Sequence, residues 1–313
     1  ITTLSKLRFP LLALVLTGCA RTPPSAELRY QTTVGLTYIP NVQFSPFYVA
    51  EAEGLFTERS VAATLRHHGA QEGLFTALVA GQEHYVIAGG DELVQARSQG
   101  MDLVAIAQYY QRYPVVIIVP DASTVRAAAD LRGLRVGVPG RYGASWFGLQ
   151  AALADAGLAE SDIEVVEIGY TAQAALTTGK VDAVIGFSNN DSVQFGLAGV
   201  PTRDVPLTAA GEVPLVSVAL LTTRQHLAAN AAEATAVAQA MVAGVDRTVK
   251  DPEAALTISA TQIPGLEEPA AKDAARATLL ATIPLWKNAD GQVSGELDPA
   301  SWSAMTDFMF AKG

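Results

Sequence analysis

The chain has 313 residues, of which 50% are hydrophobic and 17% charged, so it can bury a large core and is long enough for two domains. Its formal net charge of −10 argues against a nucleic-acid partner, which would require a basic face. Because it contains one cysteine, Cys19, it can form neither an internal disulfide nor a cysteine-rich metal site.

The first segment has the features of an export signal. A short basic start precedes an apolar run, residues 10–16, that is too short to span a bilayer. We therefore interpret residues 1–19 as a signal peptide and residues 20–30 as a linker. The stretch Leu16-Thr17-Gly18-Cys19 resembles the processing box of bacterial lipoproteins, which implies a lipid on Cys19 and an extracytoplasmic protein held at the cell membrane. The alternative is an ordinary signal peptide with an incidental cysteine.

A β-rich run, residues 33–38, leads into a loop of aromatic and amide side chains. Ser45-Pro46 then starts a helix, and Gly54 is placed to end it. In open α/β sheets, ligands bind at this position, between the carboxyl end of a strand and the next helix. We expect the loop to be a pocket wall, although core packing is the alternative, and Phe47 is undecided between the two.

Strands and helices alternate along two successive parts of the chain, which predicts βαβ units and parallel sheets. The composition changes at Pro120, and a β-rich segment near residue 215 precedes a helical tail. The stretch 78–91 also resembles 176–191, in that a helix ends at glycine, an apolar strand follows, and an aspartate opens the next helix. The predicted lobes are residues 31–119 plus 217–313, and residues 120–216. A chain that crosses twice between two lobes forms a hinge and a ligand cleft.

Three further loops at predicted strand ends carry side chains suited to a flat, polar-edged ligand. Tyrosines can stack on a ring, while amide, hydroxyl and guanidinium groups hydrogen-bond its edge. The loop 137–148 has neither the dinucleotide glycine spacing nor the P-loop lysine, and Phe147 replaces the second glycine of a nucleophile elbow. The candidate ligand-binding residues are Tyr38, Asn41, Gln43, Phe44, Phe47, Asp91, Tyr110, Arg112, Tyr113, Tyr142, Ser145, Trp146, Asn189, Asn190 and Asp191.

The sequence predicts neither a metal site nor catalysis. His67 and His68 are adjacent on a strand and point to opposite faces, and no histidine–carboxylate cluster is apparent from the spacing. No acid–base or nucleophile–base pair can be assembled from the candidate loops. We therefore expect a binding protein without a cofactor.

Three motifs occur in order: residues 38–54, Ala88-Gly-Gly-Asp91 and Gly137-Val-Pro-Gly140. With them, the chain resembles bacterial ABC-importer solute-binding proteins of the family that groups thiamine-pyrimidine, nitrate, sulfonate and taurine binders with a eukaryotic pyrimidine synthase. The resemblance implies a type II periplasmic-binding-protein fold, a monomer, and a permease partner with a cytoplasmic ATPase.

Four shorter motifs look most like riboflavin-binding members of that family, which implies a flavin ligand. The alternatives are a thiamine-type aminopyrimidine and, further away, nitrate, sulfonate or taurine. A synthase-like enzyme is disfavoured, because the cysteine-rich motif of that enzyme has no counterpart here. The four motifs are Gln43-Phe44, residues 110–114, Tyr142-Gly-Ala-Ser145 and Asn189-Asn190.

Overall fold

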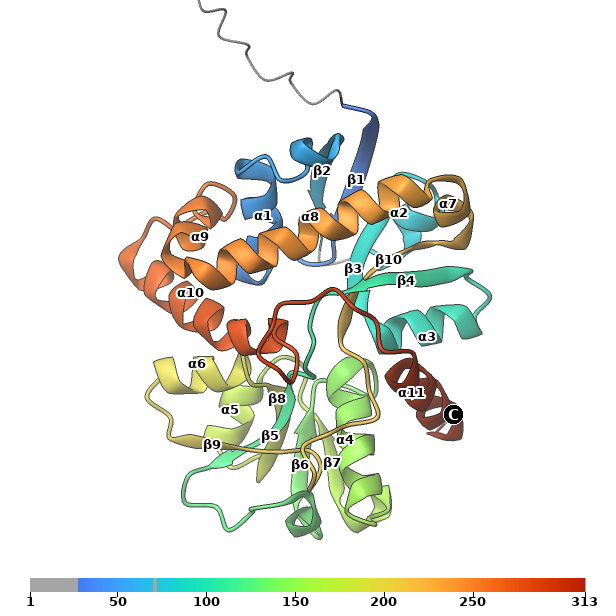
Figure 1. The fold of residues 1–313 in the computed structure, drawn as a ribbon. Helices are drawn as coiled ribbons and strands as arrows, with labels where there is room; N and C mark the ends of the chain where they lie inside the picture. The colour runs from blue at the N-terminus through green and yellow to red at the C-terminus, as the bar shows by residue number, and fades with distance from the viewer. Residues whose placement is uncertain (1–27, 70–71, 313) are drawn as a thin grey trace, which may run out of the picture.

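The computed structural model describes residues 28–69 and 72–312, which form two α/β lobes (Figure 1). The predicted fold class, two α/β lobes joined by a double crossing, is confirmed. The predicted signal peptide and Cys19 lie outside the described residues. Within the described ranges, no helix has the length and apolar character needed to cross a bilayer.

The first lobe is built on a five-stranded sheet with strand order β2-β1-β3-β10-β4. β1 pairs in parallel with β2 and β3, whereas β10, which returns from the second lobe, is antiparallel to both of its neighbours. The bounds are β1 (Tyr30–Leu36), β2 (Val61–His67), β3 (Tyr85–Gly89), β4 (Leu103–Gln108) and β10 (Val218–Thr223).

The second lobe repeats this plan with strand order β7-β6-β8-β5-β9. Again the two parallel pairs lie on one side, and the antiparallel strand that comes from the other lobe, here β5, takes the fourth place. The similarity between the two stretches of sequence therefore reflects two lobes of like topology. The bounds are β5 (Val115–Pro120), β6 (Arg135–Val138), β7 (Glu164–Glu167), β8 (Ala183–Phe187) and β9 (Thr202–Val205).

This pairing corrects the predicted boundary between the lobes. Residues 115–119 were assigned to the first lobe, but β5 pairs with β8 and β9 in the second sheet. An apolar, β-branched run predicts a buried strand without indicating which sheet it joins. The first crossing is therefore residues 109–114, and the second runs from 206 to 217.

Helices cover both sheets. In the first lobe α1 packs against α8 and α9, and α2 is a single helical turn. Asp251 caps α9 by accepting a hydrogen bond from the Ala254 N–H, as its place before a proline predicts. The bounds are α1 (Ser45–Ala52), α2 (Thr76–Val79), α3 (Gly90–Ser98), α4 (Gly143–Asp155), α5 (Ala172–Thr177), α6 (Asp191–Leu197), α7 (Arg224–Ala229), α8 (Ala231–Lys250), α9 (Pro252–Ser259), α10 (Pro269–Thr282) and α11 (Pro299–Lys312), with short 3₁₀ turns η1 (Val42–Phe44), η2 (Thr57–Arg59), η3 (Ala128–Leu131), η4 (Glu160–Asp162) and η5 (Ile283–Trp286).

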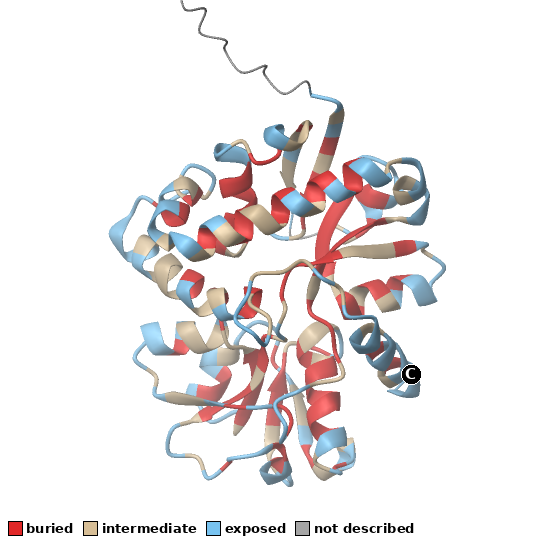
Figure 2. Cartoon of the chain, in the orientation of Figure 1, coloured by how far each residue is buried: buried red, intermediate tan, exposed pale blue. Residues whose placement is uncertain are grey.

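Each lobe has its own core of buried residues (Figure 2), and a further apolar cluster joins the two lobes. In this third cluster Met305 and Met309 of α11 pack beside Phe147 of α4 and beside Val216 of the second crossing. The Val216 N–H also lies 3.2 Å from the sulfur of Met305. α11 therefore packs on the hinge side of the molecule, against the second crossing.

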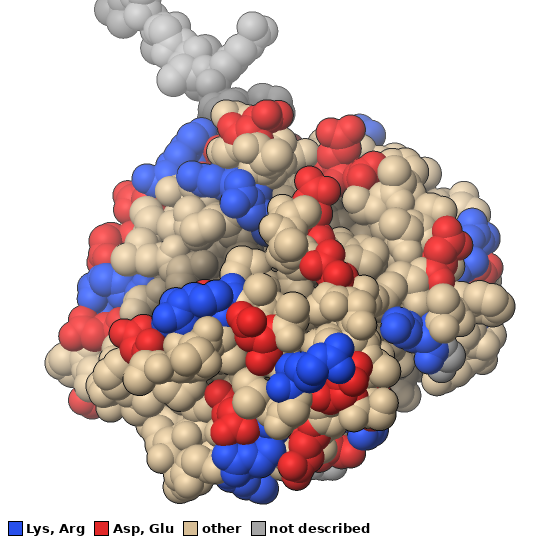
Figure 3. Space-filling view, turned by 90° about the horizontal axis from the view of Figure 1, so that it is seen from below, with Lys and Arg blue, Asp and Glu red and all other residues tan. Residues whose placement is uncertain are grey.

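Acidic and basic side chains are interspersed on the face seen from below in Figure 3. On that face no large area of a single sign of charge is visible. This face therefore lacks the basic patch that a nucleic-acid-binding face would require.

Candidate functional site

A cavity of about 190 Å³ lies on the first lobe, where the carboxyl ends of β1 and β3 meet the first crossing. This is the edge of the sheet at which α/β proteins bind ligands. It is lined by Thr37, Tyr38, Gln43, Phe44, Ile87, Ala88, Gly89, Glu92, Tyr109, Tyr110 and Val218.

The opening loop divides into wall residues and structural residues. Tyr38, Gln43 and Phe44 lie in the cavity wall, as predicted. Asn41 instead forms the N-cap of η1, where its side-chain oxygen accepts a hydrogen bond from the Gln43 N–H at 3.0 Å. Phe47 is fully buried against Tyr109, with ring centroids 5.5 Å apart, so the undecided residue belongs to the core.

Two stacked tyrosines form the aromatic part of the wall. The rings of Tyr109 and Tyr110 lie 5.3 Å apart at an angle of 16°, and Trp286 meets both edge-on. The Tyr109 hydroxyl donates to the carbonyl oxygen of Gln43 at 2.6 Å, which ties the crossing to the opening loop. Burial raises the pKa of both tyrosines, so both hydroxyls stay protonated. Tyr109 is absent from the sequence-based candidates, although it lies in the same loop.

Exposed tyrosines from the second lobe face this wall. Tyr142 is 54% and Tyr170 86% exposed, and their hydroxyl oxygens lie 3.5 Å apart. The pKa of Tyr170 is raised first by its hydrogen bond with Tyr142, and the nearby Tyr38 and Glu92 of the first lobe add to the rise. Tyr170 therefore lies near Tyr38 and Glu92 of the first lobe. Tyr170 is absent from the sequence-based candidates. It follows the end of β7, so the expectation that ligand-binding residues follow the carboxyl ends of strands (the strand-end rule) would have found it.

Asn189 connects the lobes. It is buried at the end of β8, and its amide nitrogen donates to the Thr282 hydroxyl of α10 at 3.0 Å. It also opposes the burial-driven rise in the pKa of Tyr110, so it faces the aromatic wall. Of its two neighbours, Asn190 is exposed, and Asp191 accepts a hydrogen bond from the Phe187 N–H at 2.7 Å. Asp191 therefore holds its own strand-to-helix turn.

Four other candidates lie outside the cavity wall. The Arg112 guanidinium points to the carbonyl oxygens of Lys287 and Asn288, each at 3.3 Å. The Tyr113 hydroxyl donates to the Ala144 carbonyl at 2.9 Å, which ties the first crossing to α4. Ser145 is buried in α4, and Trp146 lies beneath the Arg141 guanidinium at 4.8 Å. Tyr113, Ser145 and Trp146 therefore lie on or against α4, whereas Arg112 holds the segment that follows η5.

Two carboxyl groups lie at the start of α3. Glu92, missed by the sequence analysis, lines the cavity, and its Oε2 accepts a hydrogen bond from the Gly89 N–H at 2.7 Å. Asp91 is 2% exposed, and within the described residues its Oδ2 has no hydrogen-bond partner. Burial, followed by the charge of Glu92, raises the pKa of Asp91 to about 7. Glu92 therefore lines the cavity, whereas its neighbour Asp91 is buried and does not.

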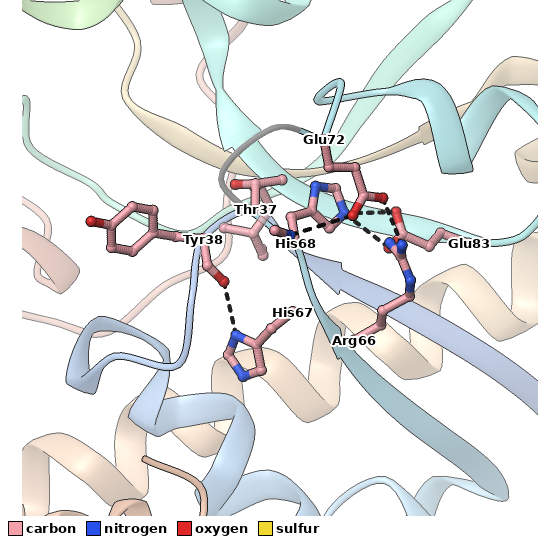
Figure 4. A network of polar contacts seen from close by, with 9 residues as sticks. Thr37, Tyr38, Arg66, His67, His68, Glu72 and Glu83 are labelled. Atoms are coloured by element: carbon pink, nitrogen blue, oxygen red, sulfur yellow. Dashed lines mark hydrogen bonds and ion pairs between the residues drawn. The ribbon is translucent and has the colours of Figure 1, made fainter. Parts of the chain in front are cut away.

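A histidine–carboxylate network lies behind the opening loop, contrary to the sequence-based expectation (Figure 4). His68 Nε2 is 2.9 Å from Glu83 Oε1, and Arg66 contacts Glu83 at 2.6 Å and Glu72 at 2.7 Å. The three side chains His68, Glu72 and Glu83 have the geometry of a metal site. However, Arg66 already supplies the positive charge, so we interpret the network as structural. Arg66 lies on β2, His68 and Glu72 follow that strand, and Glu83 lies in the turn before β3. Spacing along the chain does not show that these segments are neighbours.

His67 points away from that network, as the alternation along a strand predicts (Figure 4). Its Nδ1 lies 2.9 Å from the carbonyl oxygen of Tyr38, and its Nε2 lies 3.0 Å from the Tyr48 hydroxyl. His67 therefore links the backbone of the opening loop to Tyr48 of α1.

The model of the NMT1/THI5 like family matches residues 41–255, which is more than half of the chain. The chain belongs to this family. The match begins at the opening loop and includes both crossings between the lobes.

Two curated relatives are similar over most of the chain. A riboflavin-binding protein from Chloroflexus aurantiacus is 30% identical over 300 residues, covering 94% of this chain and 84% of its own. A formylaminopyrimidine-binding protein from Halalkalibacterium halodurans is 20% identical over 300 residues, covering 95% of this chain and 90% of its own. This family member is thus similar to binding proteins for two different heterocycles.

Among solved structures, the periplasmic aliphatic sulphonate binding protein of Escherichia coli aligns with a TM-score of 0.71. It is 18% identical, and the alignment covers 91% of this chain and 93% of that one. At this identity the match establishes the fold alone, which is that of periplasmic solute-binding proteins.

Proposed function

We propose that the protein is the extracytoplasmic solute-binding component of an ABC importer, and that its ligand is riboflavin or a related flavin. The two lobes capture the flat ring in the cleft, and the closed protein delivers it to a permease driven by a cytoplasmic ATPase. The observation that carries the proposal is the aromatic wall of Phe44, Tyr109 and Tyr110, which faces Tyr142 and Tyr170 of the second lobe.

This wall suits a planar ring. Aromatic faces gain from stacking on a ring, while phenol and amide groups nearby can hydrogen-bond its edge. The cavity of about 190 Å³ is smaller than the roughly 300–1,000 Å³ of a site that encloses a whole drug-sized ligand. The ring therefore occupies the first-lobe cavity, and the remainder of the ligand extends toward Tyr142 and Tyr170.

The relatives support a heterocycle over a small anion. The similarity to the riboflavin-binding protein extends over nearly the whole chain, and the formylaminopyrimidine-binding relative makes an aminopyrimidine the second candidate. None of the described residues that line the cavity is lysine, arginine or histidine, which disfavours nitrate, sulfonate or taurine. We propose no catalytic step, because these lining residues include no nucleophile–base pair.

Equilibrium titration with riboflavin, a thiamine-type aminopyrimidine and taurine tests the ligand. Stacking on tyrosine should quench the flavin fluorescence, and replacing Tyr38 or Tyr142 by alanine should weaken binding about tenfold, as loss of one stacking partner does. The matched control is Phe310→Ala, since Phe310 is 89% exposed on α11. No flavin binding at micromolar concentration, with tight pyrimidine binding instead, would replace the first candidate by the second.

The lipid anchor and the monomeric state are further parts of this proposal. Cys19 is the residue proposed to carry the lipid, and two acyl signals are enough for stable membrane attachment. Cys19→Ser should move the protein from the membrane fraction to the soluble fraction. A variant that stays with the membranes would argue against the anchor. Size-exclusion chromatography with light scattering checks the monomer.

A further inference from the structure

Glu92 stands out in the cavity wall because it is the one carboxylate among eleven lining residues. Its Oε2 accepts a hydrogen bond from the Gly89 N–H at the start of α3; burial raises the pKa of Glu92, and this hydrogen bond opposes that rise. The Glu92 side chain is partly exposed, and within the described residues Oε1 receives no hydrogen bond, so this oxygen is open to solvent until a ligand covers it. A ligand that covers Oε1 must supply a donor, or the oxygen loses its hydrogen bond to water.

The start of α3 would otherwise attract an anion. A helix N-terminus presents free N–H groups and a positive dipole end to the cavity. Here the chain's own Glu92 covers the Gly89 N–H, and the buried Asp91 lies beside it in the first turn. This terminus is therefore occupied by carboxyl groups of the chain itself.

Basic side chains near the cleft are engaged elsewhere. Arg112 bonds two backbone carbonyls, and Arg141 pairs with Glu160 and Glu167. Neither lines the cavity. Glu92 is therefore not neutralised by a cation in the wall, and a negative group placed against it would be repelled.

We infer that Glu92 is the specificity-determining residue of the cleft, accepting a hydrogen bond from an N–H on the edge of the bound ring. This inference rests on the proposed flavin ligand. The oxidised flavin ring itself carries one N–H donor, the imide between its two carbonyl groups, so this edge points to Glu92. The other faces of the ring then lie against the Tyr109–Tyr110 stack and Phe44. The site selects a neutral ring with a donor edge and excludes an anionic edge.

Riboflavin and 3-methylriboflavin test the inference, because they differ only in that the imide N–H is replaced by N–CH₃. The wild-type protein should bind riboflavin at least about tenfold more tightly, the loss expected for one charge-assisted hydrogen bond. In Glu92→Gln the preference should fall to about twofold or less, because an amide no longer supplies the charged acceptor. Glu92→Ala should bind the methylated flavin more tightly than the wild type does, since it leaves room for the methyl group.

The matched control is Glu267→Gln, an exposed acid outside the cavity wall, which should keep the wild-type preference. Glu92→Gln retains an oxygen for the Gly89 N–H, so the cap of α3 persists, and urea unfolding checks this. Equal binding of the two flavins by the wild type, or an equal loss for both in Glu92→Gln, overturns the inference while the flavin proposal stands. Absence of binding of either flavin overturns the proposed function itself.

Discussion

Gly244 lies where α8 crosses α1, the helix that follows the opening loop. A Cβ atom at this position would overlap the carbonyl oxygen of Pro46 and lie 3.0 Å from its carbonyl carbon and 3.1 Å from the Ala50 Cβ. All three atoms belong to the backbone or to a short side chain, so no rotamer change can make room. The two helices would have to move apart.

Whether Gly244→Ala raises or lowers the free energy of unfolding depends on two opposing contributions, helix propensity and overpacking. Glycine-to-alanine in a helix interior ordinarily stabilises by about 0.8–1 kcal/mol. Overpacking a tight contact costs about 1–3 kcal/mol, and a clash with backbone belongs at the upper end. We therefore expect Gly244→Ala to lower the free energy of unfolding by about 1–2 kcal/mol. It should also weaken ligand binding, because α1 would shift together with the turn that carries Gln43 and Phe44.

Gly196 provides the matched control. It is also helical, in α6, and a Cβ there would meet nothing within 4 Å, so Gly196→Ala should stabilise by a few tenths to about 1 kcal/mol. Urea unfolding measures both variants, and a shifted midpoint at unchanged slope identifies a change in stability. If Gly244→Ala were as stable as Gly196→Ala, the argument from close helix packing would be refuted.

Three further predictions concern buried polar groups. Burial raises the pKa of Asp91 from 3.8 to about 7, so the folded state favours the neutral carboxyl group, and the stability that this group contributes falls as pH rises from about 4 to 7. Asp91→Asn should therefore raise the melting temperature at pH 8 and change it little near pH 4. Equal shifts at both pH values would contradict this. Glu83 is 1% exposed, so Glu83→Gln should cost about 3 kcal/mol in urea unfolding by leaving the charges around it uncompensated, whereas Glu72→Gln, at the more exposed end of the same network, should cost much less. Asn189→Ala removes the hydrogen bond to Thr282, worth about 1 kcal/mol, and should increase the radius of gyration of the ligand-free protein in solution scattering; unchanged curves would show that this bond does not hold the lobes together.

The strand-end rule located much of the candidate site. Tyr38, Gln43, Phe44 and Tyr110 were found from the residue types that follow apolar runs, and all four line the cavity. The same rule could not separate them from Asn41, whose amide instead holds the loop. A cap and a wall residue have the same sequence signature, because polar side chains favour both positions.

Local patterns in the sequence determined the alternation of strands and helices, the helix starts at Pro46 and Pro252, and the similar build of the two lobes. Such features depend on contacts between near neighbours, so periodicity and capping chemistry reveal them. Tertiary structure decided which sheet receives β5, because an apolar strand fits either one until its hydrogen-bonding partners are known.

Tertiary structure also decided which polar groups meet. His68 and Glu83 come together through the packing of β2, β1 and β3, and Asn189 meets Thr282 from the other lobe. The role of Glu92 became apparent only from its place in the cavity wall, since along the chain it is one acid in the first turn of a helix. Contacts between distant segments depend on register and lobe packing, which no local pattern encodes.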